Sequence, residues 1–124
     1  MNTSVLTVDP TASIGEAAEK MVDAGVGAIV VVEDLVRIIG IVTERDILRA
    51  AAARARAAEA RVRQWMTADV VTIEPDVTVE EAAKIMFERN FRHLPVVKDG
   101  RPLGIVSLRR LSRWEFEHAA PAAK

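Results

Sequence analysis

The stretch Gly40-Ile41-Val42-Thr43-Glu44-Arg45-Asp46 decides the fold, because its first three residues return 64 positions later as Gly104-Ile105-Val106. Upstream of it, an offset of 65 aligns eight further pairs of identical residues. These pairs are Pro10 with Pro75, Glu16-Ala17-Ala18 with Glu81-Ala82-Ala83, Met21 with Met86, Val31-Val32 with Val96-Val97, and Asp34 with Asp99. Two copies of one unit therefore fill the chain, and we expect no separate catalytic domain within it.

Each copy carries the start and stop signals of a helix. Ser13-Ile14-Gly15-Glu16 and Thr78-Val79-Glu80-Glu81 match the capping box, in which the hydroxyl accepts from a helical N–H and the Glu side chain reaches back to the cap. An apolar stripe follows each cap. Gly25 and Asn90 then suit the left-handed turn that ends a helix.

Two short strands are predicted after each helix, because the runs that follow are apolar and rich in β-branched side chains. The predicted strands cover residues 28–32, 38–42, 94–97 and 103–106. Lys98-Asp99-Gly100-Arg101 predicts a hairpin turn, and Thr43 and Ser107 suit the start of a further helix. Each copy thus reads strand, helix, strand, strand, helix, with repeat 1 at residues 1–61, repeat 2 at 62–118 and a tail at 119–124.

An alanine-rich segment from residue 44 to about 63 predicts one long helix between the copies. Five of its arginines are spaced five, two, five and two residues apart: Arg49, Arg54, Arg56, Arg61 and Arg63. Because this spacing does not stack them on one helical face, a solvated surface and a site for a bound polyanion both stay open. For Trp65 and Trp114, near the copy boundaries, we expect packing in the core or in a dimer.

Composition limits the classes of function. The 124 residues are 50% hydrophobic and 28% charged, which is typical of a globular protein. Seventeen basic and eighteen acidic side chains give a net charge of −1, so we expect neither nucleic acid nor a membrane as partner. There is no cysteine, and His93 and His118 are the only histidines, so no metal site is expected. The first residues do not resemble a secretory signal, and we expect a cytoplasmic location.

The two copies resemble CBS domains, named for cystathionine β-synthase, in the tandem arrangement called a Bateman module. The stretch Gly40 to Asp46 is close to the family signature of Gly, hydrophobic, any, Thr or Ser, any, any, Asp, and Arg92-His93-Leu94-Pro95-Val96-Val97 matches the phrase that opens the middle strand. The resemblance covers nearly the whole chain. It implies an α+β fold of two βαββα repeats about a pseudo-two-fold axis, with packed sheets, flanking helices and adenosine-type ligands in clefts between the sheets.

Thr43 and Asp46 are the candidate ribose-binding residues. A strand ending at Val42 and a helix beginning after Thr43 place helix N–H groups at a sheet edge, where phosphorylated ligands are favoured. A carboxylate accepts two hydrogen bonds from a vicinal diol, and the Thr43 hydroxyl adds a third. The alternative is that both residues only cap the helix, which stabilises it by about 1 kcal/mol.

Arg92 and His93 are the candidate phosphate-binding residues, as the resemblance implies for basic residues at this position. The alternative is a charged surface loop. The copies complement one another, because copy one has Gly27 and Ala28 where copy two has these two basic residues. One complete site can therefore be assembled from the ribose residues of copy one and the phosphate residues of copy two.

The opposite cleft is expected to be degenerate, because Ser107 is present but Arg110 replaces the acid. Arg110 would bind an anion there or pair with a carboxylate. For the complete site, the resemblance assigns the adenine to apolar walls that are equally good core residues. These residues are Val5, Leu6, Val26 and Ile41.

These residues favour a regulatory module that senses AMP, ADP or ATP and passes the change to an unknown protein target. The sulfonium of S-adenosylmethionine would sit badly beside Arg92, so AMP or ATP is expected. The sequence contains no P-loop and no nucleophile elbow, the motifs that would indicate an enzyme. We expect no enzymatic activity and no required cofactor. The alternative is a non-catalytic scaffold with vestigial clefts. We expect a homodimer, with apolar groups of the C-terminal stretch in its interface: Leu108, Leu111, Trp114 and Phe116.

Overall fold

A computed structural model describes residues 6–34 and 36–108 of the chain. Its elements are β1 (Thr7–Val8), α1 (Ile14–Ala24), β2 (Ala28–Glu33), β3 (Arg37–Thr43), α2 (Glu44–Ala52), α3 (Val62–Trp65), α4 (Val79–Arg89), β4 (His93–Lys98) and β5 (Arg101–Ser107). The first repeat, β1 to α2, has the predicted order, and α4, β4 and β5 repeat its middle part. The expected last helix lies outside the described residues beyond Leu108.

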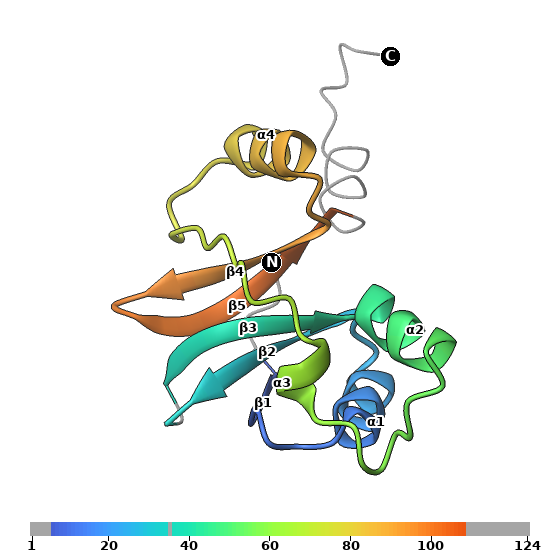
Figure 1. The fold of residues 1–124 in the computed structure, drawn as a ribbon. Coiled ribbons are helices and arrows are strands. Elements are labelled where there is room, and N and C mark those ends of the chain that lie inside the picture. Colours follow the sequence, from blue (N-terminus) through green and yellow to red (C-terminus); the bar gives the residue numbers. More distant parts are fainter. Residues whose placement is uncertain (1–5, 35, 109–124) are drawn as a thin grey trace.

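The two repeats form two sheets that pack together with helices on their outer sides, which is the predicted α+β fold (Figure 1). In the first sheet β2 lies between β1, to which it is parallel, and β3, to which it is antiparallel. In the second sheet β4 and β5 pair antiparallel. Figure 1 shows β5 beside β3, α4 on one outer side, and α1 and α2 on the other. The repeats therefore meet through their sheets.

The internal repeat of the sequence is also a repeat of backbone pairing. Val8 is paired with Val31 in the first repeat, where β1 runs parallel to β2. Ile73 is paired with Val96 in the second repeat, also in parallel, as an isolated bridge. Each residue of the second pair stands 65 positions after its equivalent, so the alignment of the copies is confirmed in space.

The helices on the outer sides begin at the predicted caps. At α1 the Ser13 hydroxyl accepts from the Glu16 N–H at 3.0 Å, and the Glu16 carboxylate accepts from the Ser13 N–H at 3.4 Å, which completes the capping box. At α4 the Thr78 hydroxyl accepts from the Glu81 N–H at 3.1 Å. The reciprocal bond to the Glu81 side chain is not formed in the part of the chain that the structure describes, so only half of the second box is confirmed.

Left-handed residues end both helices and form the predicted hairpin turn. Gly25 ends α1 with a φ of 67° and Asn90 ends α4 with a φ of 58°. Between β4 and β5, Asp99 and Gly100 have φ angles of 53° and 77°. Two successive positive φ angles characterise the type I′ turn, whose twist matches that of the flanking strands.

The prediction of one helix from residue 44 to about 63 is wrong. The helix α2 ends at Ala52, and α3 begins only at Val62. The loop between them supplies acceptors for the N-terminus of α1: the carbonyl of Ala60 accepts from the Ile14 N–H, and that of Ala57 from the Gly15 N–H, both at 2.8 Å. These bonds outweigh the helix propensity of alanine. With α2 this short, no helix among the described residues could cross a membrane.

The side chains of β2 alternate between two buried environments. Ile29 and Val31 belong to the core of the first repeat, which also includes residues of α1 and α2. Ala28, Val30 and Val32 point to the opposite face, where the second sheet lies, and are also buried. The second repeat has a smaller core of its own, formed by Ile73, Ala82, Met86, Leu94 and Val96.

The segment that joins the repeats crosses β3 at a glycine. Ile41 and Thr67 exchange two backbone hydrogen bonds of 3.0 and 2.8 Å. A methyl group at Gly40 would lie 2.5 Å from the Sδ of Met66 and 3.0 Å from the carbonyl oxygen of Thr67. Gly40 therefore permits a close approach that a side chain would oppose, and this approach brings Thr67 to the start of α2.

Candidate functional site

The predicted ribose and phosphate residues lie at the ends of strands. Thr43 is the last residue of β3 and the N-cap of α2, and Asp46 lies in the first turn of that helix. Arg92 is exposed in the loop after α4, and His93, half-buried, is the first residue of β4. Arg92 makes no ion pair among residues 6–34 and 36–108.

The Asp46 carboxylate is buried, with the residue only 3% exposed, and both its oxygens accept hydrogen bonds. Oδ2 accepts from the Thr43 N–H at 2.9 Å and from the Thr43 hydroxyl at 3.2 Å. Oδ1 accepts from Nη1 of Arg49 at 3.0 Å and from the Thr67 hydroxyl at 3.3 Å. The capping bonds between Thr43 and Asp46 are therefore formed in this structure, and Arg49 and Thr67 supply the further donors to the carboxylate.

Arg49 and Trp65 extend this cluster toward α3. The Arg49 guanidinium lies 5.7 Å from the centroid of the Trp65 ring, a cation–π distance. Trp65 packs, partly buried, against the first core, so the core packing expected for it is confirmed. The side chain of Arg49 is 58% exposed, and its bond to Asp46 can therefore exchange with water or a ligand.

The two repeats meet at Gly27, where the first turn of α2 approaches the first residue of β4. The Glu44 N–H donates to the carbonyl of Gly27 at 3.0 Å. A methyl group at Gly27 would overlap Oε1 of Glu44 and lie 3.4 Å from Cε1 of His93. Glu44, from the stretch that carries Thr43 and Asp46, thus lies beside a predicted phosphate residue of the other repeat. We call Gly27, Glu44, Arg92 and His93 the seam.

Burial lowers the pKa of His93 below its ordinary value of 6.5. The carboxylate of Glu44 acts in the opposite direction and the guanidinium of Arg92 adds to the lowering, but burial has the largest effect. The imidazole is therefore neutral at pH 7. In that state it can still donate one hydrogen bond to a phosphate oxygen, and an anion bound beside it would raise its pKa.

Sequence reasoning did not assign Glu44, Arg49 or Thr67 to the site. Arg49 was predicted only as one of a series of exposed arginines, although its spacing from Asp46 permits an ion pair on one helix. No local signal could have identified Thr67, which reaches Asp46 through the crossing at Gly40. Likewise, the approach of Glu44 to His93 depends on how the two sheets pack.

The predicted adenine walls are only partly brought together. Leu6 and Val26 pack, partly buried, against the core of the first repeat. Ile41 is also buried but is not part of that core. Val5 lies outside the described residues, so the adenine pocket stays a prediction.

The second cleft is described only in part. Ser107, the last residue of β5, pairs with His93 across the second sheet. Arg110, predicted to replace the acid of that cleft, lies outside the described residues. Whether the second cleft is degenerate thus stays a prediction.

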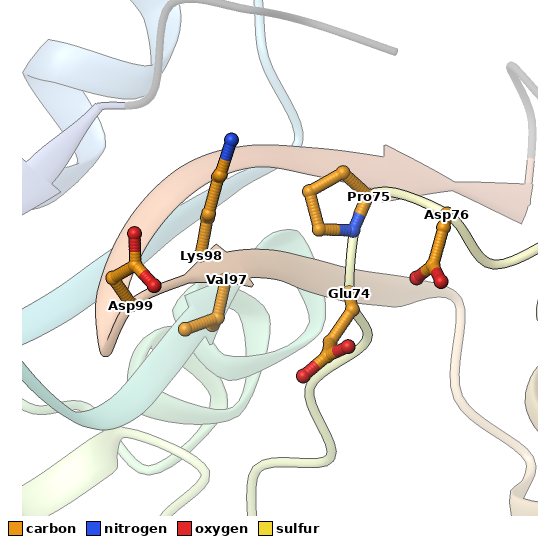
Figure 2. Close-up of a pocket in the computed structure, with 6 residues that line it drawn as sticks. All are labelled: Glu74, Pro75, Asp76, Val97, Lys98 and Asp99. Carbon is orange, nitrogen blue, oxygen red and sulfur yellow. The ribbon is translucent and has the colours of Figure 1, made fainter.

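A pocket of about 370 Å³ lies away from the seam, at the far end of β4 from His93 (Figure 2). Six residues line it: Glu74, Pro75, Asp76, Val97, Lys98 and Asp99. Figure 2 shows the Lys98 ammonium pointing away from the carboxylates of Glu74 and Asp76. Within the described ranges, no three His, Cys, Asp or Glu side chains could together hold a metal ion, and we assign this pocket no ligand.

Comparison with known proteins identifies both repeats. The family model described as "CBS domain" matches residues 1–53 and 62–117. An uncharacterised 17.7 kDa protein of Acidianus ambivalens is 42% identical over 112 residues, 90% of this chain and 67% of that protein. The CBS domain-containing protein YhcV of Bacillus subtilis is 38% identical over 108 residues, 87% of this chain and 76% of that protein. The inosine-5'-monophosphate dehydrogenase of Methanocaldococcus jannaschii is 35% identical, but the match spans only 23% of that enzyme.

Solved structures agree with the fold. The CBS-domain containing protein ATU1752 from Agrobacterium tumefaciens has a TM-score of 0.84 at 35% identity, over 92% of this chain and 91% of that one. The CBS domain pair of protein MJ0100, in complex with 5'-methylthioadenosine and S-adenosyl-L-methionine, has a TM-score of 0.86 at 28% identity, over 94% and 92%. The protein PAE2072 from Pyrobaculum aerophilum, complexed with AMP, has a TM-score of 0.79 at 30% identity, over 88% and 84%.

Proposed function

The chain belongs to the CBS domain family as a tandem pair, and from this premise we propose that it is a regulatory module that binds an adenosine nucleotide between its repeats. Thr43 and Asp46 would hold the ribose, and Arg92 and His93 the phosphate. The bound nucleotide would shift the packing between the repeats, and a protein target, not yet identified, would read this shift. We propose no catalytic residue, and we expect the module to act in the cytoplasm.

One observation carries the proposal. The residues suited to ribose and those suited to phosphate are split between the repeats, and the approach of Glu44 to His93 over Gly27 supports a site shared by both. The solved relatives add support, since MJ0100 was crystallised with two adenosine derivatives and PAE2072 with AMP. We therefore propose one nucleotide per chain, with AMP or ATP as the ligand.

A ribose can reach Asp46 only by exchange of hydrogen bonds. Two vicinal hydroxyls would replace the Thr67 hydroxyl and the Arg49 guanidinium, which are the partners of Asp46 that lie outside the capping box. Thr67 belongs to the segment between the repeats, and Arg49 stacks on Trp65. Ligand binding would thus change contacts of the inter-repeat segment, which is the differential interaction that a regulatory shift requires.

Isothermal titration calorimetry with AMP, ADP, ATP, S-adenosylmethionine and NAD tests the proposal directly. We expect binding of AMP or ATP with a stoichiometry of one ligand per chain. Adenosine-free phosphate compounds, such as pyrophosphate, serve as the control for unspecific anion binding. Heat from none of the five ligands would contradict the nucleotide-sensing function.

The second candidate function is a scaffold with vestigial clefts, and the hydrogen bonding of Asp46 is the observation that favours it. The Thr43 N–H, the Arg49 guanidinium and the Thr67 hydroxyl all donate to this carboxylate, so a structural role that joins the helix cap to the inter-repeat segment explains its burial. In this case the function of the chain would be dimerisation itself. A scaffold is expected to dimerise without binding any of the five ligands.

We expect a homodimer in solution, because each repeat exposes an apolar side chain at the same helix position. Val22 of α1 is 79% exposed and its equivalent, Phe87 of α4, is 89% exposed, and apolar groups of this size favour burial. Of the C-terminal residues predicted for the interface, Leu108 is 40% exposed. The others, Leu111, Trp114 and Phe116, lie outside the described residues.

Light scattering at micromolar concentration is expected to report twice the chain mass of 13.6 kDa. Phe87→Glu is expected to shift the mass toward the monomer, because a carboxylate would be buried in the interface. Val36→Glu is the matched control, since Val36 is exposed in the turn between β2 and β3 and not on a helix. A mass of 13.6 kDa for the unmodified protein would contradict the dimer.

A further inference from the structure

We propose that Glu44 is a specificity residue of the nucleotide site, whose carboxylate competes with a ligand phosphate for the basic side of the seam formed by Arg92 and His93. The inference rests on the proposed function and deepens it, because it concerns the charge of the ligand. Glu44 stands between the two predicted ribose residues in the sequence. Because its carboxylate also lies beside His93, it would lie where a nucleotide passes from its ribose to its phosphate.

Gly27 locates the carboxylate of Glu44 relative to His93. A methyl group at Gly27 would overlap Oε1 of Glu44 and come within 3.4 Å of Cε1 of His93. The carboxylate and the imidazole therefore share one small volume, which Gly27 leaves open. Gly27 takes the position in the first repeat that Arg92 takes in the second, so the first repeat places no side chain there, and Glu44 of the first repeat faces His93 of the second.

The backbone does not require an acid at this position. Leu108 is the equivalent of Glu44 in the second repeat, and its N–H donates to the carbonyl of Arg92 at 2.7 Å. The N–H of Glu44 makes the same bond to Gly27 at 3.0 Å. Since a leucine serves the backbone equally well, this backbone bond does not require the carboxylate of Glu44, which lies in the first turn of α2 and is free to act on the seam.

The charge of Glu44 is not neutralised by an ion pair. Within residues 6–34 and 36–108, no Lys or Arg lies within 4.0 Å of its carboxylate, whereas the nearby Asp46 is paired with Arg49 at 3.0 Å. The charges that act on His93 are those of Glu44 and Arg92, and they oppose each other. A phosphate approaching Arg92 and His93 would thus be repelled by Glu44, whereas uncharged adenosine would not.

Calorimetry with adenosine and AMP tests this inference in the unmodified protein and in Glu44→Gln. Removing one unit charge about 4 Å from a phosphate in water-like surroundings corresponds to about a fivefold change in affinity. We expect Glu44→Gln to bind AMP about fivefold more tightly and adenosine with unchanged affinity. Glu80→Gln is the matched control, because Glu80 is also an exposed acid in the first turn of a helix, α4, which ends before Arg92.

Each outcome decides between the hypotheses. Equal changes for adenosine and AMP, or no change for either, would overturn the role of Glu44 while the proposed function stands. If neither ligand binds any variant, the proposed function fails, and NMR of the His93 imidazole during titration with pyrophosphate decides the inference separately. A larger response to pyrophosphate in Glu44→Gln than in the unmodified protein supports competition at the seam, and an equal response or none overturns it.

Discussion

AMP at a hundredfold excess over its dissociation constant is expected to raise the free energy of unfolding by about 2.7 kcal/mol, and Asp46→Ala is expected to abolish this gain. Only the folded chain, and not the unfolded chain, can assemble a site from both repeats. Ligand binding therefore stabilises the folded state by mass action. In the proposed site Asp46 would supply the carboxylate for the ribose diol, and alanine cannot replace it. Denaturant unfolding with and without AMP measures both quantities.

The control for this first experiment is Thr78→Ala, which removes the N-cap of α4. Both variants are expected to lose about 1 kcal/mol or more of stability without ligand, because Thr78→Ala removes the N-cap hydroxyl of α4 and Asp46→Ala removes the carboxylate that accepts the Thr43 N–H at the start of α2. Only Asp46→Ala is expected to lose the response to AMP. A full response in Asp46→Ala would mean that Asp46 acts solely as a residue of the capping box.

The double substitution Arg92→Gly and His93→Ala is expected to weaken AMP or ATP at least tenfold and to leave adenosine nearly unaffected. It places the residues of the first repeat, Gly27 and Ala28, at the equivalent positions of the second. Each lost charge-assisted hydrogen bond is worth about 1.5–3 kcal/mol. Calorimetric titration of the three ligands measures the difference.

Stoichiometry is the control for this second prediction. Arg110→Asp restores an acid to the second cleft, yet we still expect about one ligand per chain, because Gly27 and Ala28 supply no cation there. Two ligands per unmodified chain would show that both clefts are competent. Nucleotide affinity that is indifferent to Arg92 and His93 would likewise contradict the assignment of the phosphate residues.

Local contacts explain which parts of the fold were predictable. The caps at Ser13 and Thr78, and the left-handed ends at Gly25 and Asn90, involve residues only a few positions apart, so the residue types suffice. The helix expected from residue 44 to about 63 failed for the opposite reason. Its loop is held by bonds to α1, which lies far away in the sequence, and helix propensity does not take such bonds into account.

The contacts of the candidate site also divide into local ones, which the sequence could predict, and long-range ones, which it could not. Thr43 and Asp46 are three residues apart, so their hydrogen bonds were among the predicted alternatives. The Thr67 hydroxyl is 21 positions from Asp46 and reaches it only because Gly40 lets the inter-repeat segment cross β3 closely. The packing of the two sheets, not any spacing in the chain, brings Glu44 beside His93.

The sequence by itself determined the two repeats, the order of their elements and the division of the candidate ribose and phosphate residues between them. Periodicity, capping and internal identity are properties of neighbouring residues or of the aligned copies, and they can be recognised before the chain folds. Only the tertiary structure decided where α2 ends, which groups donate hydrogen bonds to the Asp46 carboxylate and which charged side chain lies beside His93. These features depend on contacts between segments distant in the sequence, and such contacts exist only once the sheets have packed.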